Sequence, residues 1–200
     1  MRSLDAGTHH GKRLSFDDSE RWVLGPGLTL TECDLLLKKC TIRTLQLMDV
    51  QLINSRISVT GGLEGFVDWC RCRISGCTFT GTFEGNSFGA WPEEYGPGGD
   101  LSDCDFSGSS LRGCQFLGID VGSLVFPRWP NFTILDPVPR EKELLAAGWP
   151  GKLAFWVEGA VLCPETTVAI SYDARDLVAG FDCDLDTLRE HLRQLGGVLM

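Results

Sequence analysis

Residues 99–126 read GDLSDCDFSGSSLRGCQFLGIDVGSLVF, and their spacing predicts the architecture of the chain. Large apolar residues recur here at steps of five, at Leu101, Phe106, Leu111, Phe116, Val121 and Phe126. A smaller or apolar residue stands two positions before each of them, at Gly99, Cys104, Ser109, Cys114, Ile119 and Leu124. A helix repeats its apolar residues about every 3.6 positions and a strand about every two, so a period of five fits neither. It fits a chain that turns a corner every five residues and points one column of side chains inward.

Glycines mark the corners of this pattern, because Gly108, Gly113 and Gly118 close successive units. Glycine suits such turns since it adopts backbone angles that larger residues resist. Several short sides of this kind close into a coil, and stacked coils bury a continuous core between neighbours. The stretch therefore predicts a mainly β fold of the solenoid type. The competing interpretation is a period of five that arose by chance in an ordinary β-rich domain.

Three successive units, CDFSG, SSLRG and CQFLG at residues 104–118, resemble the pentapeptide-repeat family, whose loose consensus is Ala-(Asp/Asn)-Leu-x-x. The resemblance implies a right-handed, quadrilateral β-helix with four pentapeptides per coil. It also implies that the central Leu or Phe and the small residue two before it both point inward. The match is specific over residues 99–126 and looser elsewhere.

Residues 28–88 carry a degenerate version of the same period. It begins at Leu30 and Leu35, shifts by two residues, and breaks at Gly61-Gly62. Its later members are Leu37, Ile42, Leu47, Leu52, Ile57, Trp69, Ile74, Phe79, Phe83 and Phe88, with partners such as Cys40, Val67, Cys72 and Cys77 two positions before. We therefore predict a β-helix over residues 28–126, with a loop insertion at 89–98 and four to five coils.

Residues 1–27 are polar and charged, and they show neither the apolar period nor the apolar segment of a signal peptide. We predict an N-terminal cap or tail, in which Phe16, Trp22 and Val23 cover the first coil. A solenoid end needs such a cover, because an open coil exposes strand edges. No run of about 18 apolar residues occurs anywhere, so no membrane span is predicted.

The segment GAWPEEYGPGG at residues 89–99 interrupts the period. Its prolines and glycines exclude a helix or a paired strand, so it predicts a loop that leaves one face of the stack. Insertions in solenoids often carry recognition. The candidate partner-binding residues in and beside this loop are Trp91, Glu93, Glu94, Tyr95, Asp100 and Asp103. The alternative is a solvent loop whose aromatic residues pack back on the body.

The period stops after Phe126, and residues 127–200 predict a small α/β appendage. Residues 127–141 are proline-rich and indicate a linker or a wrap along the coil. Residues 141–147 indicate a short helix, 152–162 a strand or buried segment, and 166–171 a strand. Leu185, Leu188, Leu192 and Leu195 form one amphipathic helical stripe, which Asp184 or Asp186 caps and Gly196-Gly197 ends. The appendage caps the last coil, forms a second subdomain, or pairs with another copy.

Nine cysteines occur, and six of them stand two before a central apolar residue, at Cys33, Cys40, Cys72, Cys77, Cys104 and Cys114. In that slot a cysteine packs as a small apolar residue. The odd total without a secretion signal predicts reduced thiols and a cytoplasmic location. No metal or cofactor is predicted: Cys70-x-Cys72 has no second ligand pair, and Asp182-x-Asp184-x-Asp186 lacks the later residues of a calcium loop.

Catalytic signals are missing as well. No hydrolase, metalloprotease or phosphate-binding motif occurs. Three histidines leave little for acid–base catalysis, and His191 falls at the edge of the C-terminal stripe, as a surface or half-buried residue. We therefore predict that the protein is not an enzyme.

The net charge of −9 belongs to the second half of the chain. Residues 1–27 and 28–88 are each balanced, whereas 89–126 hold six acids and one base, and 127–200 hold eleven acids and seven bases. Such a field disfavours nucleic acid as a direct ligand and favours a basic protein partner, unless the acidity serves solubility alone.

These observations predict a protein-binding module, and we expect a bacterial immunity protein that neutralises a cognate toxin by blocking its active or binding surface. It is expected to be a monomer or a homodimer through the C-terminal region. The family resemblance implies one alternative, a DNA-mimicking protein that protects type II topoisomerases, although the balanced charge of residues 28–88 counts against it. Another is a scaffold for an unidentified activity in residues 127–200.

Overall fold

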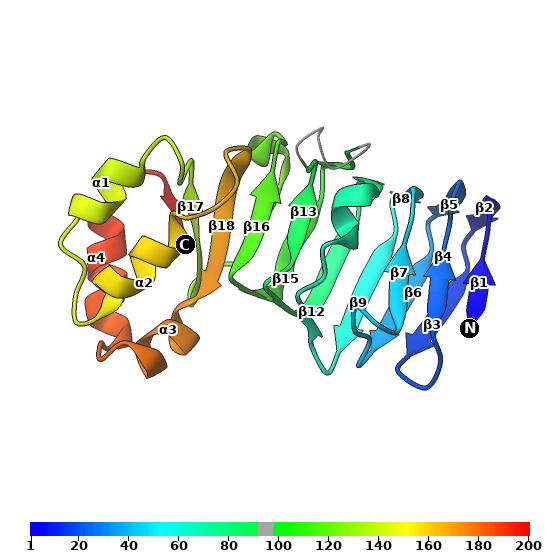
Figure 1. Ribbon diagram of the computed structural model, residues 1–200, viewed down its shortest axis with the longest axis horizontal. Coiled ribbons are helices and arrows are strands. Elements are labelled where there is room, and N and C mark those ends of the chain that lie inside the picture. The colour runs from blue at the N-terminus through cyan, green and yellow to red at the C-terminus, as the bar shows by residue number, and fades with distance from the viewer. Residues whose placement is uncertain (92–97) are drawn as a thin grey trace.

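The computed structural model describes residues 1–91 and 98–200. It is mainly β, with parallel sheets wound into a β-solenoid of about four turns and helices gathered at the C-terminal end. Figure 1 shows the N-terminus at one end of the stack and the helices at the other. The solenoid predicted from the period of five is therefore confirmed.

The coils stack their strands along separate sides. The first side holds β1 (Arg2–Leu4), β4 (Trp22–Leu24) and β7 (Leu45–Leu47). The second holds β2 (Gly7–His10), β5 (Leu28–Thr31), β8 (Val50–Ile53), β11 (Arg73–Ser75) and β14 (Asp100–Ser102). The third holds β3 (Arg13–Asp17), β6 (Asp34–Lys38), β9 (Arg56–Thr60), β12 (Thr78–Glu84) and β15 (Asp105–Arg112), with β10 (Leu63–Glu64) beside the end of β12. A fourth side begins only late, with β13 (Ser87–Gly89) and β16 (Cys114–Leu117).

The interior is the predicted column of side chains. Leu101, Phe106, Leu111 and Phe116 are at most 1% exposed. The rings of Phe79 and Phe106 stack with centroids 4.5 Å apart, because their coils lie one above the other. Two predicted members fall outside this column, however. Ile42 is 54% exposed and Val67 is 39% exposed.

Each of these two exceptions has a local cause. Ile42 lies in a turn closed by the Leu45 N–H, which donates to the Thr41 carbonyl oxygen at 2.9 Å, and this turn replaces a strand. Val67 precedes the short 3-10 helix η1 (Asp68–Arg71), which takes the place of a strand above β7. The Asp68 carboxylate accepts the Leu47 N–H at 3.0 Å and holds η1 there. A second such helix, η3 (Val121–Ser123), follows β16.

One corner shows how each coil is turned. A residue with positive φ stands between the second and third sides in every coil, at Gly11, Glu32, Asn54, Gly76 and Asp103. The corner backbones also join neighbouring coils, since the Asn54 N–H donates to the Ser75 carbonyl oxygen at 2.9 Å. After the last four of these corners the next residue points inward and is small, at Cys33, Ser55, Cys77 and Cys104, all at most 2% exposed, whereas the exposed Lys12 follows Gly11. The prediction that these cysteines fill inward slots is confirmed.

The expected cap at residues 1–27 is wrong, because those residues form the first coil and the start of the second. β1, β2 and β3 pair in parallel with β4, β5 and β6. Phe16 is opposite Leu37 in the core and does not cover a coil from outside. The period does continue here, through Leu4, His9 and Leu14, but a histidine in the column hides it.

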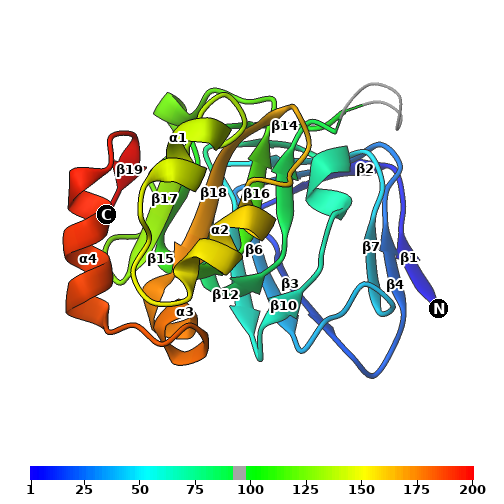
Figure 2. The same ribbon diagram turned by 60° about the vertical axis from the view of Figure 1, so that its left-hand side comes forward.

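The C-terminal region adds three antiparallel strands to the fourth side. These are β17 (Asn131–Leu135), β18 (Thr167–Asp173) and β19 (Val198–Leu199), and the sheet order is β13-β16-β18-β17-β19. Its helices are α1 (Glu141–Ala146), α2 (Leu153–Ala160), α3 (Ala174–Gly180) and α4 (Leu185–Gln194), and they lie beyond β17 and β18 (Figure 2). None of the helices among residues 1–91 and 98–200 is long and apolar enough to cross a membrane.

The predicted helices at 141–147 and in the leucine stripe and the strand at 166–171 are confirmed, and Asp184 caps α4 through the Thr187 N–H at 2.9 Å. Two other predictions are wrong. Residues 152–162 contain α2, so the strand alternative is wrong there, and the linker alternative for 127–141 is wrong because that segment contains β17. α3 was not predicted.

The appendage caps the last coil, which is the first of the three roles expected for it, because Ala169, Val168 and Leu135 pack on the solenoid core. A second core lies under the helices and includes Leu188 and Leu192 of α4, both 0% exposed.

Candidate interaction surfaces

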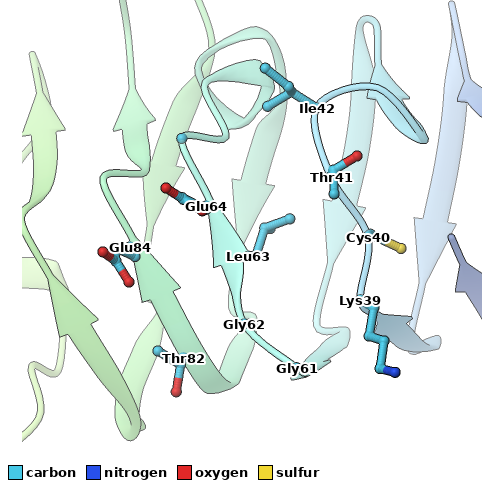
Figure 3. A pocket seen from close by; sticks show the side chains of 11 residues that line it. Lys39, Cys40, Thr41, Ile42, Gly61, Gly62, Leu63, Glu64, Thr82 and Glu84 are labelled. Atoms are coloured by element: carbon cyan, nitrogen blue, oxygen red, sulfur yellow. The ribbon is translucent and has the colours of Figure 1, made fainter.

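An open groove of about 610 Å³ crosses the solenoid where the fourth side is incomplete (Figure 3). One wall is the segment 39–42, which follows β6, and the other is 61–65 with the end of β12. A turn at Thr41 takes the place of a strand on this side, so the described residues pair no second strand with β10 and the groove stays open there. Within the described ranges, β10 is the edge of its sheet, paired only with β12. The lining residues are Lys39, Cys40, Thr41, Ile42, Gly61, Gly62, Leu63, Glu64, Gly65, Thr82 and Glu84.

One wall of this groove is acidic. Glu64 on β10 is directly opposite Glu84 on β12, and both are exposed. Glu84 is in turn opposite Arg112, but the Arg112 Nε atom is 2.9 Å from the Asp176 carboxylate. In the part of the chain that the structure describes, no ion pair includes Glu64, Glu84 or Lys39, which lies on the other wall. Like charges on opposite strand positions repel each other, so this wall favours a cationic group between the two carboxylates.

A second acidic surface lies at the corner of the last coil. Asp100 and Asp103 are exposed there, and Asp105 is beside them at the start of β15. The carboxylate of Asp100 accepts the Leu101 N–H at 2.9 Å and that of Asp105 accepts the Ser107 N–H at 2.8 Å. Over residues 1–91 and 98–200, none of the three aspartates forms an ion pair. The structure therefore brings two predicted residues together and adds Asp105, whose place between Cys104 and Phe106 already indicated an outward side chain.

The predicted recognition loop is only partly described. Trp91 follows β13 and is half-buried, whereas Glu93, Glu94 and Tyr95 lie outside the described residues. The two ends of the loop meet, because a Cβ atom on Gly98 would be 3.2 Å from the Cβ atom of Ala90. The returning chain rejoins the stack where the Gly99 N–H donates to the Cys70 carbonyl oxygen at 2.7 Å. The two described ends of the insertion, at Ala90 and Gly98, therefore lie beside each other on the solenoid.

A smaller hollow of about 380 Å³ marks the junction with the C-terminal region. Asp173 is one of its lining residues, and its buried side chain accepts from Arg175 Nε at 2.9 Å and from Ser110 Oγ at 3.1 Å. Burial alone would raise the pKa of Asp173, but the hydrogen bonds from Arg175 and Ser110 outweigh it and lower the pKa. Because Ser110 belongs to β15 and Asp173 to β18, this network ties the cap to the last coil.

The thiols of the solenoid are buried, and at several of them burial stabilises the protonated form. Burial raises the pKa of Cys40 to about 11 and that of Cys70 and Cys114 to about 12. Protonated thiols pack as apolar groups and are poor nucleophiles and metal ligands. Among the residues that the structure describes, no group of three or more His, Cys, Asp or Glu side chains is arranged to hold a metal ion. In the described part of the chain, neither thiols nor a metal site therefore contributes to the two acidic surfaces, and the groups that they present to a partner are the carboxylates described above.

No family model matches the chain, and neither a curated protein nor a solved structure matches it. The resemblance to the pentapeptide-repeat family stays a prediction from residues 99–126.

Proposed function

We propose that this protein is a non-enzymatic binding module that takes a basic segment of another protein into the groove beside β10. The observation that carries the proposal is the acidic wall, on which Glu64 and Glu84 are opposite each other and, among the residues that the structure describes, form no ion pair. A lysine or arginine between these carboxylates would relieve their repulsion and gain a charge-assisted hydrogen bond.

The remaining walls suit a polypeptide. β10 offers a strand edge within the groove, and an extended segment can add to such an edge through its main chain. Ile42 is exposed on the opposite wall and gives an apolar contact, while Lys39 beside it disfavours a segment that is basic throughout. The expected ligand is therefore an extended segment with one basic side chain next to an apolar one.

Neutralisation of a toxin is the specific form of binding that we propose. Stacked coils form a rigid body, so little conformational entropy is lost when a partner docks. The acidic corner of Asp100, Asp103 and Asp105 extends the negative field beyond the groove and speeds encounter with a basic surface. Such a body could cover the basic active or binding surface of a cognate toxin, as an immunity protein does.

The DNA-mimicking alternative has less support. Along the third side, Arg13, Asp34 and Arg56 are in register, so charges of both signs alternate on that face. Arg13 and Asp34 pair with their Nε and Oδ2 atoms 3.4 Å apart. A surface that imitates the DNA backbone would carry negative charge alone.

The test compares two charge-matched double variants as baits in extracts of the native host. Glu64→Gln with Glu84→Gln removes the acidic wall, and Glu141→Gln with Glu165→Gln removes two exposed carboxylates elsewhere. We expect a basic protein that binds the wild type and the control, that is lost with the groove variant, and whose toxicity co-expression of the wild type suppresses. The proposal fails if nothing binds in a groove-dependent way, or if the protein that does bind is acidic.

A further inference from the structure

Helix α2 has two apolar faces, and only one of them is covered. Leu153, Val157 and Val161 point into the second core and are at most 7% exposed. Phe155 is 70% exposed and Leu162 is 80% exposed, seven residues further along. The Leu162 N–H donates to the Gly159 carbonyl oxygen at 3.2 Å, so the helical turn continues to Leu162.

A flat surface lies between these two side chains. Gly159 is four residues after Phe155 and three before Leu162, so all three share one face of the helix. A Cβ atom on Gly159 would meet nothing within 4 Å. Phe155, Gly159 and Leu162 therefore form an apolar face, the α2 face, on which another backbone can approach closely.

Two opposite charges flank the α2 face in a regular way. Lys152 is three residues before Phe155 and Glu158 is three after it, and both are exposed. At about 100° per residue, these side chains lie roughly 60° to either side of Phe155. Neither belongs to an ion pair in the described ranges 1–91 and 98–200.

We infer that the α2 face joins two copies of this chain in a symmetric dimer. The two-fold axis would lie in the plane of the interface, pass beside Phe155 and be perpendicular to the line from Lys152 to Glu158. It brings Lys152 of each copy against Glu158 of the other. The two Phe155 rings then meet on the axis, and Gly159 lets the helices approach. The face is complementary to itself, as an isologous interface requires.

Other occupants fit this surface less well. The α2 face carries one cation and one anion, so it has no net charge to select an acidic or a basic partner. The C-terminal helix α4 is not available for pairing, because Leu188 and Leu192 are 0% exposed. Figure 1 shows α2 beyond β17 and β18 at one end of the molecule, with β16 and β15 between it and β12 of the groove, so a dimer leaves the groove accessible.

The dimer is expected to be weak. A standard interface buries roughly 800 Å² on each partner, which is more than one face of an eight-residue helix supplies. The monomer and the dimer should therefore exchange on dilution.

Analytical ultracentrifugation of the full chain over a range of concentrations tests the inference. We expect Phe155→Asp to abolish the dimer, and the matched change Met48→Asp, also at an exposed apolar residue, to leave it intact. Lys152→Glu or Glu158→Lys alone should weaken it at least tenfold. The double charge swap, or an equimolar mixture of the two single variants, should restore it.

Three outcomes would overturn the inference. They are a wild type that stays monomeric at the highest soluble concentration, a dimer that survives Phe155→Asp, and single charge variants whose loss the swap does not repair. All substituted side chains are exposed, so circular dichroism should show every variant folded as the wild type is.

Discussion

The solenoid at residues 1–126 and the cap at 127–200 share one sheet but build their cores in different ways. In the solenoid, equivalent side chains stack on one another, as the rings of Phe79 and Phe106 do at 4.5 Å. In the cap, helices bring together side chains from unrelated positions, such as Trp149 and Trp156, whose ring centroids are 5.2 Å apart. The sheet changes from parallel to antiparallel between β16 and β18, and this change ends the growth of the stack.

The change of direction has a physical consequence. A parallel coil always leaves an edge for another coil, whereas β18 returns the chain across the edge of β16 and allows helices to cover the end. The solenoid therefore repeats one local arrangement of strands, whereas the cap has a non-repeating arrangement that ends the stack. The following experiments test how far the two regions differ.

The largest contrast should be in thiol reactivity. All seven solenoid cysteines are buried, whereas Cys163 and Cys183 of the cap are half-buried. We expect two of the nine thiols to react with a thiol reagent in the native protein, and the rest to react slower by roughly a thousandfold or more, because they wait for unfolding. Cys163→Ser with Cys183→Ser should remove the fast phase, and a third fast thiol would contradict the contrast.

The next effect is the loss of a stacked ring. Phe106→Ala leaves a cavity beneath Phe79 and beside Phe88 and should reduce the free energy of unfolding by about 3–5 kcal/mol. Val125→Ala, at a residue that is 53% exposed, is the control and should change it by less than about 0.5 kcal/mol. Urea denaturation followed by circular dichroism measures both. If part of the transition keeps its wild-type midpoint in Phe106→Ala, the cap folds without the solenoid.

A smaller effect is expected at the junction. Asp173→Asn weakens the bonds from Arg175 and Ser110 and should cost about 1–3 kcal/mol near neutral pH. The pKa of Asp173 is lowered from 3.8, so the unfolded state binds a proton first as the pH falls. The free energy of unfolding of the wild type should therefore lose this contribution below about pH 4, whereas that of Asp173→Asn should show no such dependence on acid. Asp18→Asn, at an exposed residue, is the control, and the same acid profile in both variants would contradict the assignment.

The smallest effect is expected from His191 in the cap. Burial lowers the pKa of His191 from 6.5, and its ring centroid is 4.7 Å from that of Trp149. Because the folded state disfavours the charged ring, stability should fall as the pH drops below about 6.5. His191→Gln should remove this dependence between pH 7 and 5.5, whereas His10→Gln, on the exposed face of β2, should keep it. Thermal denaturation at each pH measures the difference, and an unchanged slope in His191→Gln would contradict the prediction.

The sequence predicted the solenoid and not the detail of the cap, and particular residues show why. Phe106 and Leu111 reveal the fold because each coil side is only five residues long, so the pattern is local. Leu153 and Val157 did not reveal α2, since a short apolar segment is compatible with a helix or a buried strand. His9 hid the first coil because a polar residue occupies the inward column at the open end.

By itself, the sequence determined the inward column, the small residues at the corners, the leucine stripe of α4 and the acidity of the last coil. The tertiary structure alone decided which outward residues meet. Leu63 is opposite Phe83, twenty positions later, whereas Phe83 is opposite Leu111, twenty-eight positions later. The length of each coil sets the register between neighbours, and that register places Glu64 against Glu84 on the wall of the groove. A period of five specifies what points inward, but the pairing of outer faces depends on every turn and insertion between the coils.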